Sequence, residues 1–135
     1  MSWLDLSVLY VAATLMGEAG TDTEPAMHAV GETIVVRAKE RKLLPIEVVT
    51  QKSQYSCWNK GSKHLLARVP KWREQRPDRW TDAVALATEI VYGKFPVSER
   101  RFNHYYNPRL CRPWWRARLR DKTTIGKHIF GRIGK

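Results

Sequence analysis

The feature that most limits the possible folds of this sequence is a nearly continuous apolar stretch close to its start. From Trp3 to Met16 the residues are apolar with three polar interruptions. A helix that is apolar on all sides has to be surrounded by other elements. We therefore expect a central helix that ends near Gly20, a residue suited to a left-handed helix stop. Its longest apolar run, Val8 to Met16, is too short for a bilayer, which takes about 20 residues.

A second helix is predicted directly after the first. Thr23 can cap its start, and Pro25 suits its first turn. Apolar residues then recur at the spacing of one helix face. These residues are Met27, Val30, Ile34 and Ala38. The helix should end in the basic cluster Arg37, Lys39, Arg41 and Lys42. Residues 46–51 are expected to add a short turn of helix.

The rest of the chain predicts a long loop, one more helix and a few strands. Residues 59–79 contain glycine and prolines without clear periodicity, so we expect a loop or irregular insertion. A third helix should begin at a Thr81 cap and end at Gly93. We expect extended chain at 102–107, a short basic helix at 113–120 and a final strand at 125–130. This order predicts a mostly helical α+β fold in a single domain, 1–135.

The net charge of the chain limits its partners. The chain has 24 Lys and Arg against 13 Asp and Glu, which gives +11. Residues 98–135 hold eleven basic residues against Glu99 and Asp121, a net charge of +9. A polyanionic partner is expected. Nucleic acid, an acidic lipid or lipopolysaccharide, and a carboxylate-bearing cell wall all satisfy this constraint.

The cysteines and the first residues bear on the cellular compartment. Cys57 and Cys111 show no CxxC spacing and no regular Cys/His cluster, so we expect buried thiols rather than metal ligands. The residues before the apolar stretch carry no Lys or Arg, so no secretory signal peptide and no transmembrane segment are expected. The protein should be made in the cytoplasm and reach any other compartment by another route.

Glu18 is the candidate with the clearest chemistry. If the first helix is buried, Glu18 lies at its C-terminal end, next to the partial negative charge of exposed carbonyl groups. Burial and this dipole both disfavour the carboxylate, so the pKa of Glu18 should rise. A carboxyl group that keeps its proton at neutral pH can act as a general acid on a glycosidic oxygen. An exposed carboxylate at a helix end is the simpler interpretation, and the flanking glycines favour a cleft instead.

Three polar and aromatic stretches are candidate sugar-binding segments. Residues 54–59, 103–108 and 125–130 can each present rings, amides and hydroxyls on one surface. Aromatic rings cover the apolar faces of sugars, and amides and hydroxyls bind sugar hydroxyls. The candidate substrate-binding residues are Gln54, Tyr55, Ser56, Trp58, Asn59, His104, Tyr105, Tyr106, Asn107 and His128. Ordinary strand packing is the alternative for each stretch.

Four motifs occur in a characteristic order. They are GEA at 17–19, QYSCWN at 54–59, HYYNP at 104–108 and IGKHIF at 125–130. Together they resemble the cell wall hydrolase family typified by the SleB spore cortex-lytic enzyme, which also includes phage endolysins. The resemblance implies a lysozyme-like domain that cleaves the glycan strand of peptidoglycan between N-acetylmuramic acid and N-acetylglucosamine.

The resemblance also implies the roles of the residues. Glu18 would be the catalytic acid and then the base, and the muramic C6 hydroxyl would attack to give a 1,6-anhydro product. This is the reaction of a lytic transglycosylase, which needs no metal and no cofactor. A basic catalytic domain fits a monomeric phage endolysin, made in the host cytoplasm and acting in the periplasm. Its basic surface would attract the anionic outer membrane or lipopolysaccharide.

Three other functions remain as alternatives. A hydrolysing muramidase needs a second carboxylate, for which Asp22, Glu24 and Glu32 are the nearest candidates. Glu32 can also form a solvated i,i+4 pair with His28. A zinc amidase is a weaker alternative because the four histidines match no zinc motif. A nucleic-acid-binding module ranks third, because the basic residues are scattered and no recognition helix stands out.

Overall fold

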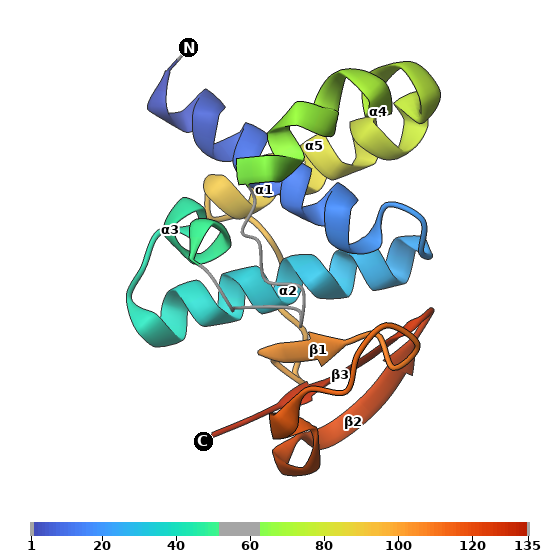
Figure 1. Ribbon diagram of the computed structural model, residues 1–135. Helices are drawn as coiled ribbons and strands as arrows, with labels where there is room; N and C mark the ends of the chain where they lie inside the picture. The colour runs from blue at the N-terminus through green and yellow to red at the C-terminus, as the bar shows by residue number, and fades with distance from the viewer. Residues whose placement is uncertain (1, 52–62, 135) are drawn as a thin grey trace.

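The computed structural model describes residues 2–51 and 63–134. Within these residues the helices come first in the chain, and a three-stranded antiparallel sheet follows in the C-terminal third (Figure 1). The predicted mostly helical α+β class is confirmed. In the described part of the chain, every helix is too short or too polar to cross a membrane.

Helix α1 (Trp3–Ala19) is the central element of the helical part. Its start is fixed by a capping box, in which the Ser2 hydroxyl accepts from the backbone N–H of Asp5. Helices α2, α3 and α5 pack around it, as expected for a helix that is apolar on all sides. The predicted left-handed stop at Gly20 is wrong. Gly20 has right-handed helical angles and its N–H still bonds the Met16 carbonyl, so it extends the helical path.

Helix α2 (Glu24–Arg41) begins as the sequence predicts. The Thr23 hydroxyl accepts from the backbone N–H of Ala26, and a proline occupies the first turn. The helix ends at Lys42, which takes a left-handed conformation. The helix thus ends in the predicted basic cluster, of which Arg37 is 1% exposed and belongs to the buried face. Helix α3 (Pro45–Thr50) then forms the predicted short turn of helix.

The prediction of a loop over 59–79 is wrong for the described part of that range. The 3-10 helix η1 (Lys63–Arg68) leads into α4 (Val69–Gln75), and α5 (Pro77–Val91) follows directly. Each α-helix has a proline in its first turn, where the missing N–H has no partner to lose. The prolines therefore start helices here, and the predicted Thr81 cap lies inside α5. Trp72 of α4 stacks on Trp80 of α5 at 6.2 Å between ring centroids.

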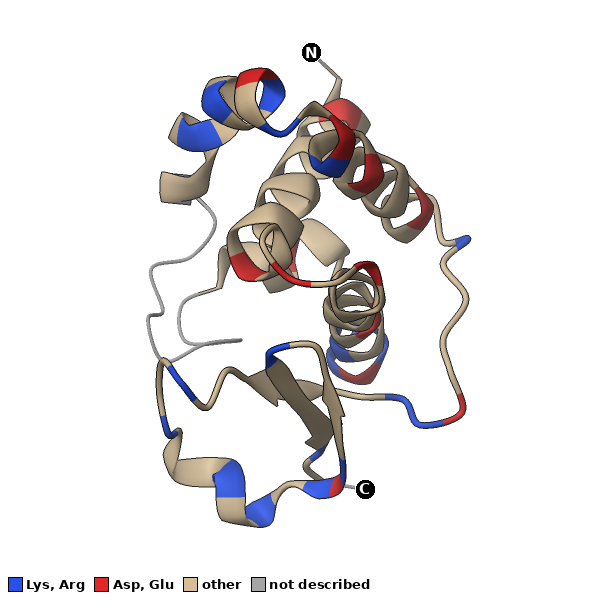
Figure 2. Cartoon of the chain, turned by 90° about the vertical axis from the view of Figure 1, so that its right-hand side faces the viewer, with Lys and Arg blue, Asp and Glu red and all other residues tan. Residues whose placement is uncertain are grey.

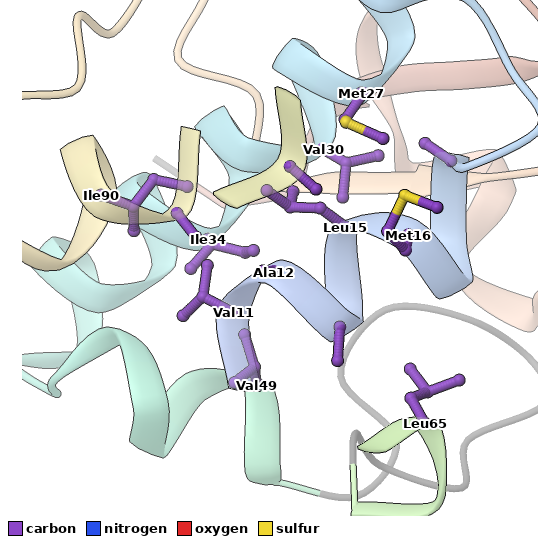
Figure 3. Close-up of a cluster of buried hydrophobic side chains, with 14 of the residues drawn as sticks. Val11, Ala12, Leu15, Met16, Met27, Val30, Ile34, Val49, Leu65 and Ile90 are labelled. Atoms are coloured by element: carbon purple, nitrogen blue, oxygen red, sulfur yellow. The ribbon is translucent and has the colours of Figure 1, made fainter. Parts of the chain in front are cut away.

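The hydrophobic core lies between α1 and its neighbours (Figure 3). Side chains from four helices and from η1 meet there. They include Val11, Leu15 and Met16 of α1, Val30 and Ile34 of α2, Val49 of α3, Leu65 of η1 and Ile90 of α5. The C-terminal end of α1 lies against η1, where Gly17 is close to Leu65, and it is bonded by Arg79 of α5. The turn that follows it contacts β3 through Asp22 and His128.

The sheet has the strand order β1-β3-β2. Its strands are β1 (His104–Tyr106), β2 (Arg120–Ile125) and β3 (His128–Arg132). The predicted extended chain at 102–107 thus contains β1. The single strand predicted at 125–130 is wrong, because Gly126 has a positive φ and turns the chain between β2 and β3. Residues 114–118 form the 3-10 helix η2 (Trp114–Arg118), where the sequence predicted a longer basic helix.

The expectation of buried thiols is wrong for Cys111. Cys111 is disulfide-bonded and only partly buried. The other cysteine of the chain, Cys57, lies outside the described residues. The short loop that carries Cys111 is thus covalently tied, which a count of two cysteines did not predict.

Candidate active site

Glu18 lies in the last turn of α1, at the edge of the helical core. The residue is partly exposed, but its carboxyl group is enclosed enough for burial to dominate its chemistry. Burial raises the pKa of Glu18 from 4.5 to about 7, while a hydrogen bond with Tyr105 and the positive charge of Arg37 act in the opposite direction. The predicted direction of the pKa shift is confirmed. At neutral pH the carboxyl group therefore populates both its protonated and its ionised form.

Backbone carbonyl groups that follow Glu18 accept hydrogen bonds from a side chain of α5. The guanidinium of Arg79, from α5, donates to the backbone carbonyls of Ala19, Gly20 and Asp22 at 2.9, 3.3 and 3.0 Å. Arg79 thus neutralises part of the helix dipole and fixes the turn after α1. Burial rather than this dipole is the main cause of the raised Glu18 pKa.

Tyr105, in the middle of β1, contacts the candidate acid. It is 1% exposed, and its hydroxyl hydrogen-bonds the Glu18 side chain. This bond lowers the pKa of Glu18, as expected when a hydroxyl donates to a carboxylate. Tyr105 therefore acts on Glu18 directly, whereas the sequence suggested only a contact with sugar.

His128 contacts the Tyr105 ring, and Asp22 in turn binds His128. The His128 ring meets it edge-on, with 5.6 Å between centroids. His128 Nδ1 lies 2.7 Å from Asp22 Oδ2. Burial alone would raise the pKa of Asp22, but hydrogen bonds from the backbone N–H groups of Lys127 and Thr23 and from His128 outweigh it and lower the pKa. Asp22 is thus an ionised acceptor, and it connects the turn after α1 to the β2–β3 turn.

The Glu32 carboxylate stabilises the fold through hydrogen bonds. It is 3% exposed, and its carboxylate accepts from the backbone N–H of Ser98, the Ser98 hydroxyl and the backbone N–H of Phe102 at 2.7, 2.9 and 3.0 Å. The solvated pair predicted between Glu32 and His28 is wrong, since the His28 ring packs on Phe95 at 4.5 Å. Glu32 anchors the segment that leads into β1.

His104 and Tyr106 lie on the other face of β1 from Tyr105. Side chains alternate along a strand, and both rings pack edge-on against Trp115 of η2, with centroids 4.9 and 5.8 Å apart. Burial, together with the charges of nearby arginines, lowers the pKa of His104 to about 3, so its imidazole is neutral at physiological pH. The Asn107 side chain accepts from the backbone N–H of Arg109 and stabilises the turn after the strand.

The structure thus brings together Glu18, Tyr105 and His128 from the predicted set. It places His104, Tyr106 and Asn107 at the far face or the end of β1. The five remaining predicted binding residues lie outside the described residues. These are Gln54, Tyr55, Ser56, Trp58 and Asn59.

Sequence reasoning missed two arginines at the site. Arg37 is buried on α2, bonds the Asn103 carbonyl at 2.6 Å and acts electrostatically on Glu18. Arg79 holds the turn after Glu18. A signal for Arg37 was present, because it lies three residues after Ile34 on the apolar face, where a charge needs a partner. Arg79 gave no such signal.

The described residues contain no group of three His, Cys, Asp or Glu side chains arranged to hold a metal ion. The site centres on one buried carboxyl group, that of Glu18, whose pKa is raised. Its neighbours are a hydroxyl donor and a buried cation, both of which favour the ionised form. Such a group can release a proton and take one back near neutral pH.

Comparison with known families places most of the chain in one family. The sequence profile of the cell wall hydrolase family matches residues 21–131. The chain belongs to the cell wall hydrolase family. The match includes Asp22, Tyr105 and His128, and it begins just after Glu18. No curated protein and no solved structure matches the chain. Membership in this family of cell wall hydrolases supports a peptidoglycan-cleaving enzyme.

Proposed function

We propose that the chain is a lytic transglycosylase that cleaves peptidoglycan between N-acetylmuramic acid and N-acetylglucosamine, with Glu18 as its acid and base. The observation that carries this proposal is the enclosed Glu18 carboxyl in the last turn of α1, where burial raises its pKa to about 7. A residue that donates a proton and later accepts one works best when both forms are accessible at the working pH.

The first step is proton donation from the Glu18 carboxyl to the glycosidic oxygen. The bond between this oxygen and the muramic anomeric carbon breaks, and positive charge develops on that carbon. Glu18 is now a carboxylate, which the Tyr105 hydroxyl and the Arg37 charge stabilise. The burial that keeps the proton on Glu18 is thus balanced by two groups that make the ionised form accessible.

The second step returns the proton to Glu18. The ionised carboxylate removes the proton of the muramic C6 hydroxyl, whose oxygen bonds to the anomeric carbon and closes the 1,6-anhydro ring. An intramolecular hydroxyl has a large proximity advantage over bulk water. Glu18 ends protonated, so the cycle balances without consuming water.

The state of the neighbouring acids supports this mechanism over hydrolysis. A hydrolase needs a second carboxylate that is free to bind water or the sugar. Asp22 is held by His128 and two backbone N–H groups, and Glu32 is held by three donors. Glu24 is exposed in the first turn of α2. A nucleophile supplied by the substrate removes the need for any of the three.

The predicted sugar-binding residues remain part of the proposal. Tyr105 and His128 are both buried, so we propose that they act on the substrate indirectly, through Glu18. Tyr106 is also buried, against Trp115, and would support the strand from behind. We propose that the remaining residues bind the glycan strand directly. These are Gln54, Tyr55, Ser56, Trp58, Asn59, His104 and Asn107.

The decisive test analyses the products. Mass spectrometry of digested peptidoglycan should show muramic ends lighter by one water than hydrolysis gives, with no new reducing ends. Glu18→Gln should abolish this product, and Glu24→Gln, which removes an exposed carboxylate from the next helix, should leave it unchanged. Reducing muramic ends would show hydrolysis instead, and a tenth or more of wild-type activity in Glu18→Gln would exclude Glu18 as the acid.

We also propose that this activity serves as a phage endolysin acting on the wall of a Gram-negative host. The net charge of +11 supports attraction to the anionic outer membrane or lipopolysaccharide. Expression in the host cytoplasm should then lyse cells only when a holin is produced as well. Lysis that does not depend on a holin would contradict this role.

A further inference from the structure

A basic groove lies beside the candidate active site. The pocket has a volume of about 360 Å³ and runs between the end of α1 and the segment formed by η1 and α4. Gly17, Gly20 and Thr21 line it on the α1 side, and Arg68, Lys71 and Arg76 line it on the other. We call these six residues the basic groove. Figure 2 shows Lys and Arg gathered on the short helices that follow the grey segment.

The charged side chains of the basic groove are all positive. Arg68, Lys71 and Arg76 are all exposed, and no Asp or Glu is among the described residues that line the pocket. Trp72 is buried beneath them, and the Arg68 guanidinium lies over its ring, 4.9 Å from the centroid. This stacking holds one cation in place, which lowers the entropic cost of binding an anion.

The basic groove lies within one helical turn of Glu18, which is not itself one of its lining residues. Gly17 and Gly20 stand on either side of this residue in the chain, and both belong to the groove. A side chain at Gly17 would run into Leu65 of η1, so the glycine allows η1 and α4 to lie close against α1. The groove is therefore close enough to Glu18 along α1 for one extended polymer to reach both.

We propose that the basic groove binds the free carboxylates of the peptide stems of peptidoglycan. The inference rests on the proposed function, because a glycan strand cleaved at Glu18 carries its stems on the adjacent muramic residues. Guanidinium and ammonium groups recognise carboxylates by charge-assisted hydrogen bonds. The basic groove would thus select glycan strands that still carry acidic peptide stems.

The test measures binding in a Glu18→Gln background, so that the substrate stays intact. The groove variant adds Lys71→Gln and Arg76→Gln, and the control variant adds Lys94→Gln and Lys122→Gln, two exposed lysines away from the groove. Both variants lose the same net charge. Co-sedimentation is measured with purified sacculi freed of phosphate polymers, either untreated or with their carboxylates converted to amides. Urea unfolding checks that both variants fold.

The groove variant should bind untreated sacculi about fivefold more weakly than the control variant, the effect expected for two solvated charge pairs. On amidated sacculi the two variants should bind equally. Equal binding to untreated sacculi, or a loss that persists after amidation, would overturn the inference. Failure of the proposed function is detected separately, since the chain with Glu18 intact would then release no fragments with 1,6-anhydro muramic ends from either preparation.

Discussion

Replacing Glu18 by Gln should change how the stability of the fold depends on pH. Burial raises the pKa of this carboxyl from 4.5 to about 7 in the folded chain. The folded state therefore holds the proton more tightly than the unfolded state. A raised pKa contributes stability that is present below pH 4.5 and is lost as the pH rises through about 7. A neutral glutamine of the same shape has no proton to lose.

The size of the effect follows from the two pKa values. Each unit of pKa difference corresponds to about 1.4 kcal/mol, so ionising Glu18 costs the fold about 3 kcal/mol at pH 8. At pH 5 the same group costs less than about 1 kcal/mol. Between pH 5 and pH 8 the free energy of unfolding of the wild type should fall by about 2–3 kcal/mol more than that of Glu18→Gln.

Urea unfolding at both pH values measures this difference. All other titrating groups are common to the two chains, so comparing their pH dependence isolates Glu18. Glu24→Gln is the matched control, because it removes an exposed carboxylate and should keep the pH dependence of the wild type. The reasoning is refuted if wild type and Glu18→Gln lose the same stability between pH 5 and pH 8.

Three further outcomes are expected. Tyr105→Phe removes the hydroxyl that lowers the Glu18 pKa, so the alkaline limb of the pH–rate profile should move to higher pH while the rate falls about tenfold; an unshifted limb would contradict the role of this hydrogen bond. Asp22→Asn should lower the free energy of unfolding by about 1–3 kcal/mol in urea at pH 7, because the charged partner of His128 is lost. Since the Asp22 pKa is lowered, this destabilisation should shrink as the pH falls below the ordinary range of an aspartate, and a constant difference would argue against it. Raising the salt concentration should weaken attachment to intact walls much more than turnover of short soluble glycans, since exposed charges are screened beyond about 8 Å at physiological salt; equal loss in both assays would place the basic residues in the catalytic site.

Local signals in the sequence determined part of the fold. The Thr23 cap and Pro25 place the start of α2, because a capping hydrogen bond spans only three residues. The apolar stretch of α1 required a surrounding layer of helices, whatever their order. The same stretch predicted the raised pKa of Glu18, since a carboxyl at the end of a buried helix is poorly solvated.

Other elements depend on contacts that a short sequence window does not contain. Helix α4 buries only Val69 and Trp72, too few residues to show a period, and its packing depends on Trp80 of the next helix. Strand β2 is mostly exposed, so no alternation of apolar residues marked it. It exists because β3 pairs with it across the Gly126 turn.

The surroundings of Glu18 were decided only by the tertiary structure. The sequence offered three aromatic and histidine residues in a row on β1, and the pleat of the strand turns Tyr105 toward Glu18 and its two neighbours toward Trp115. Asp22 and His128 lie 106 positions apart, and their contact requires the sheet to pack against the end of α1. The sequence thus predicted a buried carboxyl with a raised pKa, because the apolar stretch that ends at Glu18 has to be covered by other elements. The hydroxyl of Tyr105 and the charge of Arg37 come from other segments, and only folding brings them close to the Glu18 carboxyl.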